Sequence, residues 1–254
     1  MTGNTPDTPE LMQLADGVYV RQAVDNISWF DLGGNAVIVD ALEDRNEADA
    51  VLSALADTLG ETPVRYVINT HTHGDHVALN KTFRRHFGAE IINARTADIP
   101  PDGRLFEGPR RSALMLPLGG LHTDEDCVVH LPADGVLFTG DLFGWGMIPL
   151  IRGLNDETMQ LLEQVYERLI AFDAEKIVPG HGPPATTAHL RRFVKYLHEL
   201  RDRARRAVDA GRRDDEILAE LTPPEDMADW WRFAEWKHDD SARKVVRAVR
   251  RGKL

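Results

Sequence analysis

Short apolar runs bounded by Gly, Asn and Asp open the chain, and this pattern predicts β-strands. After Asn46 the apolar positions change to a helical spacing, and Gly60 stands where such a helix would end. A second, shorter helix is predicted to end at Gly88. The predicted strands of this first half cover residues 11–24, 27–32, 35–40, 64–69 and 89–93, and the predicted helices cover residues 46–59 and 80–87.

The second half repeats this order of elements. Residues 95–111 are rich in Pro, Gly and charge, so we expect a loop or a linker between the two halves. Strand patterns then follow at residues 113–118, 127–132, 135–140 and 175–179, with a helical pattern across residues 156–172. From Thr186 onward the pattern is helical and carries one apolar stripe.

Four side chains of metal-ligand type stand together between a predicted strand and a predicted helix. They are His71, His73, Asp75 and His76. Zn²⁺ accepts both imidazole nitrogen and carboxylate oxygen, and the alternate spacing lets His71 and His73 project the same way. Buried without a cation, these groups would repel one another or be left unpaired. The pattern favours a metal site over the alternative, a solvated polar loop.

Three further residues of ligand type each follow a predicted strand of the second half. They are His122, Asp141 and His181, and each lies beside or near glycine. Because glycine lets the backbone come close to a crowded ion site, these loops suit the same metal centre.

With these four segments, the sequence resembles the metallo-β-lactamase superfamily of hydrolases over roughly residues 11–185. The resemblance implies an α/β fold: a four-layer αβ/βα sandwich of two mixed β-sheets flanked by helices, with the metals at one edge. It implies a catalytic domain over residues 1–185. The helical pattern after Thr186 predicts a helical C-terminal extension over residues 186–254, packed on the same domain. Residues 1–10 are rich in Thr and Pro, and we expect them to be disordered.

The resemblance also distributes the ligands between two divalent cations, with zinc as the first expectation and iron or manganese as alternatives. His71, His73 and His122 would hold one cation, Asp75, His76 and His181 would hold the other, and Asp141 would bridge the two. Two cations held close together lower the pKa of the water between them, so a bridging hydroxide would be the nucleophile.

Two aspartates have further roles in this hypothesis. Asp75 would be the catalytic residue, since it would orient the hydroxide and could pass its proton to the leaving group. Asp40 matches an early aspartate of the family that supports the ligand loop by hydrogen bonding. An ordinary turn residue at the end of a strand is the alternative for Asp40.

Residue types at the ligand positions narrow the activity. The β-lactam hydrolases of the superfamily usually carry Cys or Ser where this chain has Asp141, so cleavage of a small ester, thioester or lactone is favoured. The di-iron flavoprotein branch has glutamate where this chain has His73. The alternatives are a mononuclear iron dioxygenase acting on sulfur substrates, a phosphodiesterase, a β-lactam hydrolase, and a metal-binding module without catalytic activity.

The apolar, glycine-containing loop after Asp141 is a candidate wall of a substrate pocket. It would contribute Phe143, Trp145, Met147 and Ile148, with Arg152 at the rim, and core packing is the alternative. Trp29 is a candidate flap over the metals, although an aromatic side chain packed on its own sheet is the commoner case. The segment between His76 and His122 is shorter than in many superfamily members, so the pocket would be more open, or covered by the C-terminal helices.

Charge and cysteine content limit the partners. The chain of 254 residues has 41 acidic and 30 basic side chains, and its net charge of -11 disfavours nucleic acid and anionic membranes as partners. A single cysteine, Cys127, cannot form an internal disulfide, and the sequence has neither a targeting segment nor an apolar run of membrane-spanning length. We therefore expect a cytoplasmic enzyme with a small-molecule substrate. The sequence leaves the oligomeric state open.

Overall fold

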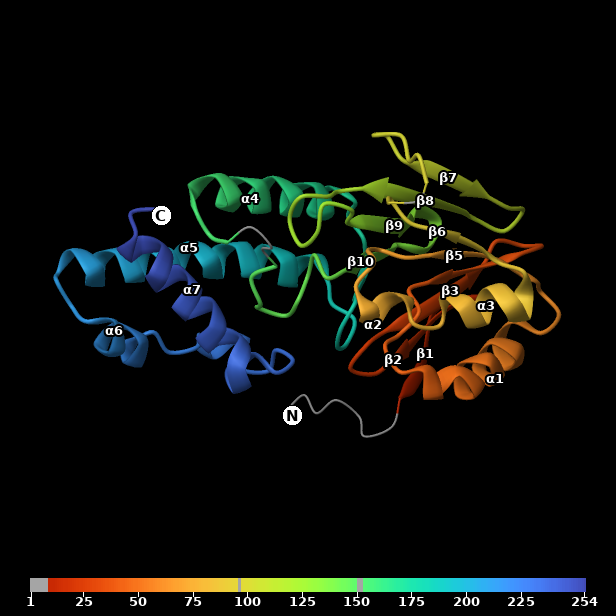
Figure 1. The fold of residues 1–254 in the computed structure, drawn as a ribbon, viewed down its shortest axis with the longest axis horizontal. Helices are drawn as coiled ribbons and strands as arrows, with labels where there is room; N and C mark the ends of the chain where they lie inside the picture. Colours follow the sequence, from red (N-terminus) through yellow and green to blue (C-terminus); the bar gives the residue numbers. More distant parts are fainter. Residues whose placement is uncertain (1–8, 96, 150–152) are drawn as a thin grey trace.

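The computed structural model of the chain describes residues 9–95, 97–149 and 153–254 (Figure 1). The strands are Glu10–Ala15 (β1), Val18–Gln22 (β2), Ile27–Asp31 (β3), Ala36–Val39 (β4), Val64–Ile68 (β5), Glu90–Ile92 (β6), Arg104–Glu107 (β7), Ser112–Pro117 (β8), Cys127–Leu131 (β9), Val136–Gly140 (β10) and Lys176–Pro179 (β11). The α-helices are Ala48–Leu59 (α1), Gly74–Val77 (α2), Asn80–Phe87 (α3), Asp156–Ala171 (α4), Thr187–Asp209 (α5), Asp214–Glu220 (α6) and His238–Arg250 (α7). Shorter helical turns are Arg45–Glu47 (η1), Pro132–Asp134 (η2), Glu225–Met227 (η3) and the π-helical Phe233–Lys237 (η4).

The strands form two mixed sheets. The six-stranded sheet has the order β1-β2-β3-β4-β5-β6, and the five-stranded sheet has the order β11-β10-β9-β8-β7. The first sheet is antiparallel from β1 to β4 and parallel from β4 to β6. The second sheet is antiparallel from β7 to β10, and β10 pairs in parallel with β11. The parallel strands therefore deliver their carboxyl ends, and the loops that follow them, to one edge of the sandwich.

Helices cover the outer face of each sheet, which completes four layers. In β4, Val37 and Val39 belong to the core between the sheets, whereas Ala36 and Ile38 pack under the helices of the first sheet. This alternation follows from the two-residue period of a strand, and it explains why strands buried on both faces have unbroken apolar sequences. The predicted four-layer sandwich is confirmed.

The C-terminal helices share a hydrophobic core with the second sheet. Leu137 of β10, Tyr166 of α4, Phe193 of α5 and Val245 of α7 all belong to one buried cluster. Figure 1 shows α5 to α7 extending away from the two sheets at the end of the molecule that carries the C-terminus. Within the described ranges, no helix is both long and apolar enough to cross a bilayer.

Two details of the predicted element map are wrong. The segment expected to be a loop or linker over residues 95–111 contains β7, whose four residues pair with β8 and extend the second sheet. The short run Arg104–Glu107 contains only two apolar residues, so periodicity alone could not distinguish it from a loop. Glu10, expected to be disordered, begins β1, whereas residues 1–8 lie outside the described part of the chain.

Candidate metal centre

The seven predicted ligands lie in two adjacent groups at the edge of the sandwich. The trihistidine group comprises His71, His73 and His122, and the mixed group comprises Asp75, His76, Asp141 and His181. Within each group, one potential ligand atom from every residue lies within 4.8 Å of all the others. The four sequence segments therefore converge as the spacing predicted.

Asp141 contacts both groups, one with each carboxylate oxygen. Its Oδ2 lies 3.4 Å from Nε2 of His122. Its Oδ1 lies 3.4 Å from Nε2 of His76 and 3.4 Å from Nε2 of His181. A carboxylate divided in this way is placed to bridge two cations, which supports the role that the sequence predicted for Asp141.

The remaining short contacts keep the groups compact. In the trihistidine group, Nδ1 of His73 lies 3.1 Å from Nε2 of His71 and 3.1 Å from Nε2 of His122. In the mixed group, Oδ2 of Asp75 lies 3.2 Å from Nε2 of His181. Imidazole nitrogens that face one another this closely each lose hydration, so a shared cation is the group that would satisfy them together.

Two glycines allow this close packing. A Cβ on Gly180 would collide with Oδ1 of Asp141 and with the ring of His76. A Cβ on Gly140 would collide with the Thr70 side chain, and Gly140 also has a positive φ of 50°. The loops after β10 and β11 reach the site only because these positions have no side chain.

Asp40 supports the ligands from behind. Its Oδ2 lies 3.0 Å from Nδ1 of the buried His76, and its Oδ1 accepts a hydrogen bond from the backbone N–H of Thr70 at 2.8 Å. The Thr70 hydroxyl in turn lies 3.2 Å from Nδ1 of His71. A carboxylate on the far nitrogen of a ligand histidine fixes its tautomer and ring orientation. These contacts support the predicted role of Asp40.

Asp25 is a supporting residue that the sequence did not reveal. Its Oδ1 lies 3.2 Å from Nδ1 of His181, and the carbonyl of Val24 lies 3.0 Å from the same nitrogen. The neighbouring Asn26 donates its side-chain amide to the carbonyls of Pro179 and Gly182, on either side of that histidine. The β2–β3 turn therefore holds the β11 loop, a contact between distant segments that leaves no local sequence signal.

Burial and the surrounding charges move the pKa values of buried histidines in the two groups in opposite directions. Burial, followed by the neighbouring His76, lowers the pKa of His71 to about 2, and burial also lowers the pKa of His122. Burial opposes the charged form of His76 as well, but Asp40 and Asp141 together outweigh it and raise the His76 pKa to about 10. A hydrogen bond from His181 lowers the pKa of Asp75 to about 2.

The donor chemistry fits a pair of divalent cations. Nε2 of His76 and Oδ1 of Asp141 are buried and face one another at 3.4 Å, but neither makes a well-formed hydrogen bond with the described residues. Buried polar atoms without partners are costly, and ligation removes that cost. A cation would also displace the proton that the carboxylates attract to His76, because histidine ligates through a neutral ring. The residues present therefore suit two metal ions with imidazole and carboxylate ligands.

Three predicted substrate contacts are wrong because the side chains are buried in the core. Trp29 is 0% exposed, its indole N–H donates to the Thr58 hydroxyl at 2.9 Å, and it packs under α1. Phe143 and Trp145 belong to the core cluster of the C-terminal helices. Burying the apolar surface of these side chains in the core stabilises the fold more than leaving it exposed in a cleft.

The other predicted contacts have different outcomes. Met147 is half-buried and stays a prediction, whereas Ile148 is 2% exposed and belongs to the core. Arg152 lies outside the described residues.

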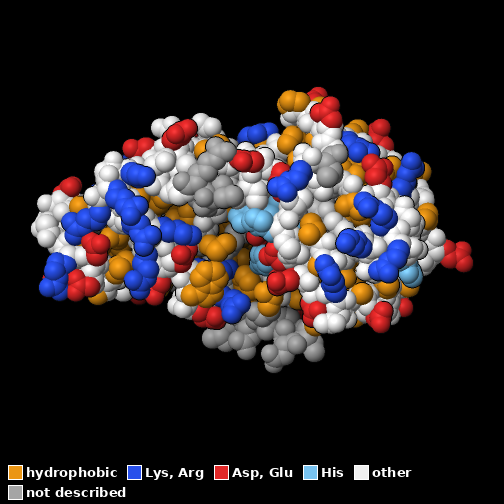
Figure 2. Space-filling model, viewed as in Figure 1, with side chains coloured by type: hydrophobic (Ala, Val, Ile, Leu, Met, Phe, Trp, Pro, Cys, Tyr) orange, Lys and Arg blue, Asp and Glu red, His pale blue; other side chains and the backbone are white. Residues whose placement is uncertain are grey.

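A C-terminal segment packs directly against the loops of the site. A Cβ on Gly182, next to His181, would meet the Trp231 ring. Lys237 donates its ammonium to the carbonyl of Gly144 at 2.9 Å and lies 3.9 Å from the centre of the Trp231 ring. Figure 2 shows histidines at the surface in a hollow between the two ends of the molecule, so this packing leaves the centre accessible. His73 is the exposed member of the trihistidine group.

Comparison with known proteins agrees with this geometry. The family model of the metallo-beta-lactamase superfamily matches residues 23–108 and 90–181. The chain belongs to the metallo-beta-lactamase superfamily. The matched ranges contain all the residues of the trihistidine and mixed groups.

Individual relatives show how far the similarity extends. A hydroxyacylglutathione hydrolase from Rhizobium meliloti (strain 1021) is 32% identical over 167 residues, which cover 62% of this chain and 61% of that protein. The chain therefore spans about three fifths of the length of that relative. Among solved structures, a metallo-beta-lactamase from Pontibacter korlensis aligns with a TM-score of 0.61 at 19% identity, over 74% of this chain and 98% of that chain.

The stereoselective inverting sec-alkylsulfatase Pisa1 from Pseudomonas sp. also aligns, with a TM-score of 0.68 at 15% identity. This alignment covers 94% of the present chain and 50% of Pisa1, so it includes C-terminal helices as well as the sandwich. At these identities the two solved structures show the fold alone.

Proposed function

We propose that the protein is a dinuclear metal-dependent hydrolase that cleaves a small thioester, with 2-hydroxyacyl thioesters of glutathione as the first substrates to test. The observation that carries this proposal is the division of the Asp141 carboxylate between the trihistidine and mixed groups, at 3.4 Å from a ligand nitrogen on each side. The substrate class is supported by the relatives, which are named hydroxyacylglutathione hydrolases.

The two cations and Asp75 would have different roles in hydrolysis at this centre. Two divalent cations would supply a water molecule of lowered pKa and would polarise the thioester carbonyl. Asp75 is ionised at neutral pH, because its pKa is about 2, and it can therefore accept a proton from the attacking water. Its Oδ2 faces Nε2 of His181 at 3.2 Å. Asp75 is thus placed to orient the water and to return the proton to the departing sulfur.

We further propose zinc as the resident metal and the cytoplasm as the location. Zinc is supported by ligand sets of imidazole and carboxylate without thiolate. The cytoplasm is supported by the absence of any cysteine pair, since the buried Cys127 is the single cysteine.

We propose the division into a catalytic domain at residues 1–185 and a helical extension at residues 186–254. The extension contributes to one buried cluster with β10 and α4, so the two parts would fold together. A chain ending at residue 185 should expose this apolar face and aggregate. A soluble, cooperatively unfolding fragment would contradict the shared core and would support independent folding.

The decisive experiment combines elemental analysis with a substrate panel. Protein purified without added metal should contain two equivalents of zinc per chain, and it should hydrolyse 2-hydroxyacyl glutathione thioesters faster than a β-lactam or a phosphodiester. A chelator should abolish hydrolysis, and added zinc should restore it. One equivalent of iron with oxygen-dependent turnover would instead indicate a sulfur dioxygenase. Metal binding without turnover of any substrate would indicate a binding module.

A further inference from the structure

A second concave site lies apart from the metal centre, between α7 and the segment that precedes α4. Its volume is about 360 Å³, and among the described residues its charged lining side chains are all basic: Lys244, Arg247, Arg251 and Lys253. Ile148, Leu154 and Ala248 add an apolar floor. In a chain with a net charge of -11, a groove with this lining concentrates positive potential locally.

Most other cations of the C-terminal helices are neutralised by nearby carboxylates. Arg250 pairs with Asp214 at 2.7 Å, although it is next to Arg251 in the sequence. Arg192 pairs with Asp226 at 2.6 Å. By contrast, no ion pair or side-chain hydrogen bond links Arg247, Arg251 or Lys253 to any described residue. Lys244 is the only lining cation with a carboxylate partner in the described ranges, Asp240 at 2.7 Å.

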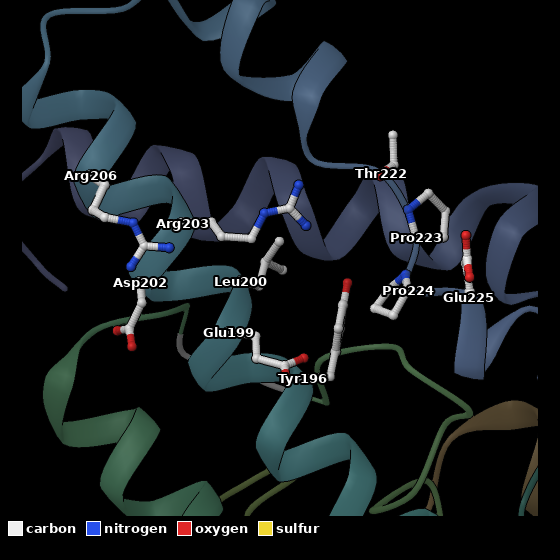
Figure 3. A pocket seen from close by; sticks show the side chains of 10 residues that line it. All are labelled: Tyr196, Glu199, Leu200, Asp202, Arg203, Arg206, Thr222, Pro223, Pro224 and Glu225. Carbon is white, nitrogen blue, oxygen red and sulfur yellow. The ribbon is translucent and has the colours of Figure 1, made fainter.

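The larger hollow of about 520 Å³ on the same helices shows the difference (Figure 3). There, Arg203 and Arg206 line the cavity together with Glu199, Asp202 and Glu225. Because three carboxylates outnumber two guanidinium groups there, that cavity presents no net positive charge that would select an anion. The described lining of the groove at α7 has basic groups and no carboxylate.

The backbone that carries these cations is fixed. Leu254 is 8% exposed and packs into the core cluster, which anchors the last residues of the chain. The carbonyl of Lys253 accepts a hydrogen bond from the backbone N–H of Asp156 at 2.8 Å, at the first residue of α4. The Asp156 carboxylate lies near Arg205, at 3.6 Å. The backbone positions that carry these cations are therefore fixed beside the groove before any ligand arrives, which lowers part of the entropic cost of binding.

We propose that this groove binds an anion that carries phosphate groups. Guanidinium groups match phosphate oxygens through two parallel hydrogen bonds, and several unpaired cations around one cavity favour a multiply charged ligand. Cations in the last turn of α7 also interact favourably with the helix dipole, but that interaction does not require them to line a cavity. Figure 2 shows basic side chains gathered over the C-terminal helices on the same face as the histidine hollow. The phosphate comes either with the substrate, as part of its thiol, or as a separate ion.

The test is calorimetric titration of the metal-loaded protein with inorganic pyrophosphate. In the Arg247→Gln/Arg251→Gln variant, the affinity of one pyrophosphate binding event should fall by more than about tenfold for each arginine removed. A matched control, Arg191→Gln/Arg243→Gln, removes the same charge from exposed positions outside the lining and should retain that event. Any pyrophosphate binding at the metals should be the same in the wild type and both double variants, so a difference between their isotherms reports on the groove. Identical isotherms for the wild type and the Arg247/Arg251 variant would overturn the proposal.

A second variant and a kinetic arm complete the test. If the double variant fails to fold, Lys253→Gln, at an exposed position, should weaken the same event, and an unchanged isotherm would again overturn the proposal. If the phosphate belongs to the substrate, the double variant should raise KM for coenzyme A thioesters and leave KM for glutathione thioesters unchanged. If the phosphate is a separate ion, both KM values should stay the same while pyrophosphate binding is lost.

Discussion

The trihistidine group and the mixed group lie side by side but hold their protons differently. Burial lowers the pKa values of His71 and His122. Burial also opposes the charged forms of His76 and His181, but the surrounding carboxylates outweigh it and raise their pKa values. Neutral histidines are ready to ligate, and histidines paired with carboxylates must first release a proton. Asp141 has one oxygen in each environment. The trihistidine group is therefore ready to bind a cation, whereas the mixed group is held together by ion pairs until a cation arrives.

Removing the shared carboxylate should have the largest effect. Asp141→Asn removes the carboxylate whose two oxygens face the two groups, so both cations should bind more weakly. We expect metal content to fall below two equivalents and kcat/KM to fall by more than about 100-fold, the upper end for loss of a residue that only supports a ligand. Asp102→Asn, at an exposed loop position, is the control and should behave as wild type. Full metal content in Asp141→Asn would contradict the bridging role.

Replacement of Asp40 should have the second-largest effect, on the metal affinity of the mixed group. Asp40→Asn removes the charge at Nδ1 of His76, which belongs to the mixed group. We expect a loss of about 10- to 100-fold in metal affinity, confined to one of the two cations. Competition titration with a chromogenic chelator measures the two affinities separately. If both affinities fell equally, the two groups would not be distinct sites.

Asp25 should have a smaller effect on the same half of the centre. Its carboxylate lies on Nδ1 of His181, but the side chain is partly exposed and the Val24 carbonyl contacts the same nitrogen. We expect Asp25→Asn to weaken one cation by less than about tenfold. An effect larger than that of Asp40→Asn, measured in the same titration, would reverse the order of support that the burial of the two residues indicates.

The smallest expected effect is the pH dependence of the thermal stability of the metal-free protein. Folding raises the pKa of His76 from 6.5 to about 10, so this residue stabilises the fold below pH 6.5 and loses its contribution as pH rises toward 10. Folding lowers the pKa of His71 from 6.5 to about 2, so stability also falls as pH drops below 6.5. The Tm of the metal-free protein should therefore be highest near pH 6.5 and change by several degrees on either side, at roughly 2–4 °C for each kcal/mol.

Variants separate the two limbs of that profile. His76→Gln should reduce the alkaline limb and leave the part that His181 contributes, because the pKa of His181 is raised as well. His71→Gln should reduce the acidic limb and leave the part that His122 contributes. Thermal unfolding from pH 5 to pH 9, with and without a chelator, provides the measurement. An alkaline limb of unchanged depth in His76→Gln would assign the dependence to groups other than His76.

Ligand residues were predictable because their chemistry is local. His71 to His76 lie in one short segment between β5 and α3, and each later ligand lies in the loop that follows β8, β10 or β11. Helix limits were also predictable where a glycine ends the helix, as at Gly60 and Gly88. In these places the information lies within a few residues of the feature.

Contacts between distant segments were not predictable in the same way. Trp29 is apolar whether it lines a pocket or packs under α1, so the sequence could not choose between the two. Asp25 looks like a turn residue, and its role depends on the β11 loop 156 residues later, the separation between the Asn26 amide and the Gly182 carbonyl. Strand β7 lacks an apolar period because it is a short edge strand.

Anomalous diffraction from crystals of the metal-loaded protein tests the central claim most directly. Two peaks should appear, one bound by His71, His73 and His122 and the other by Asp75, His76 and His181, with one oxygen of Asp141 on each. A single peak, or a second peak that Asp141 does not touch, would contradict the dinuclear centre.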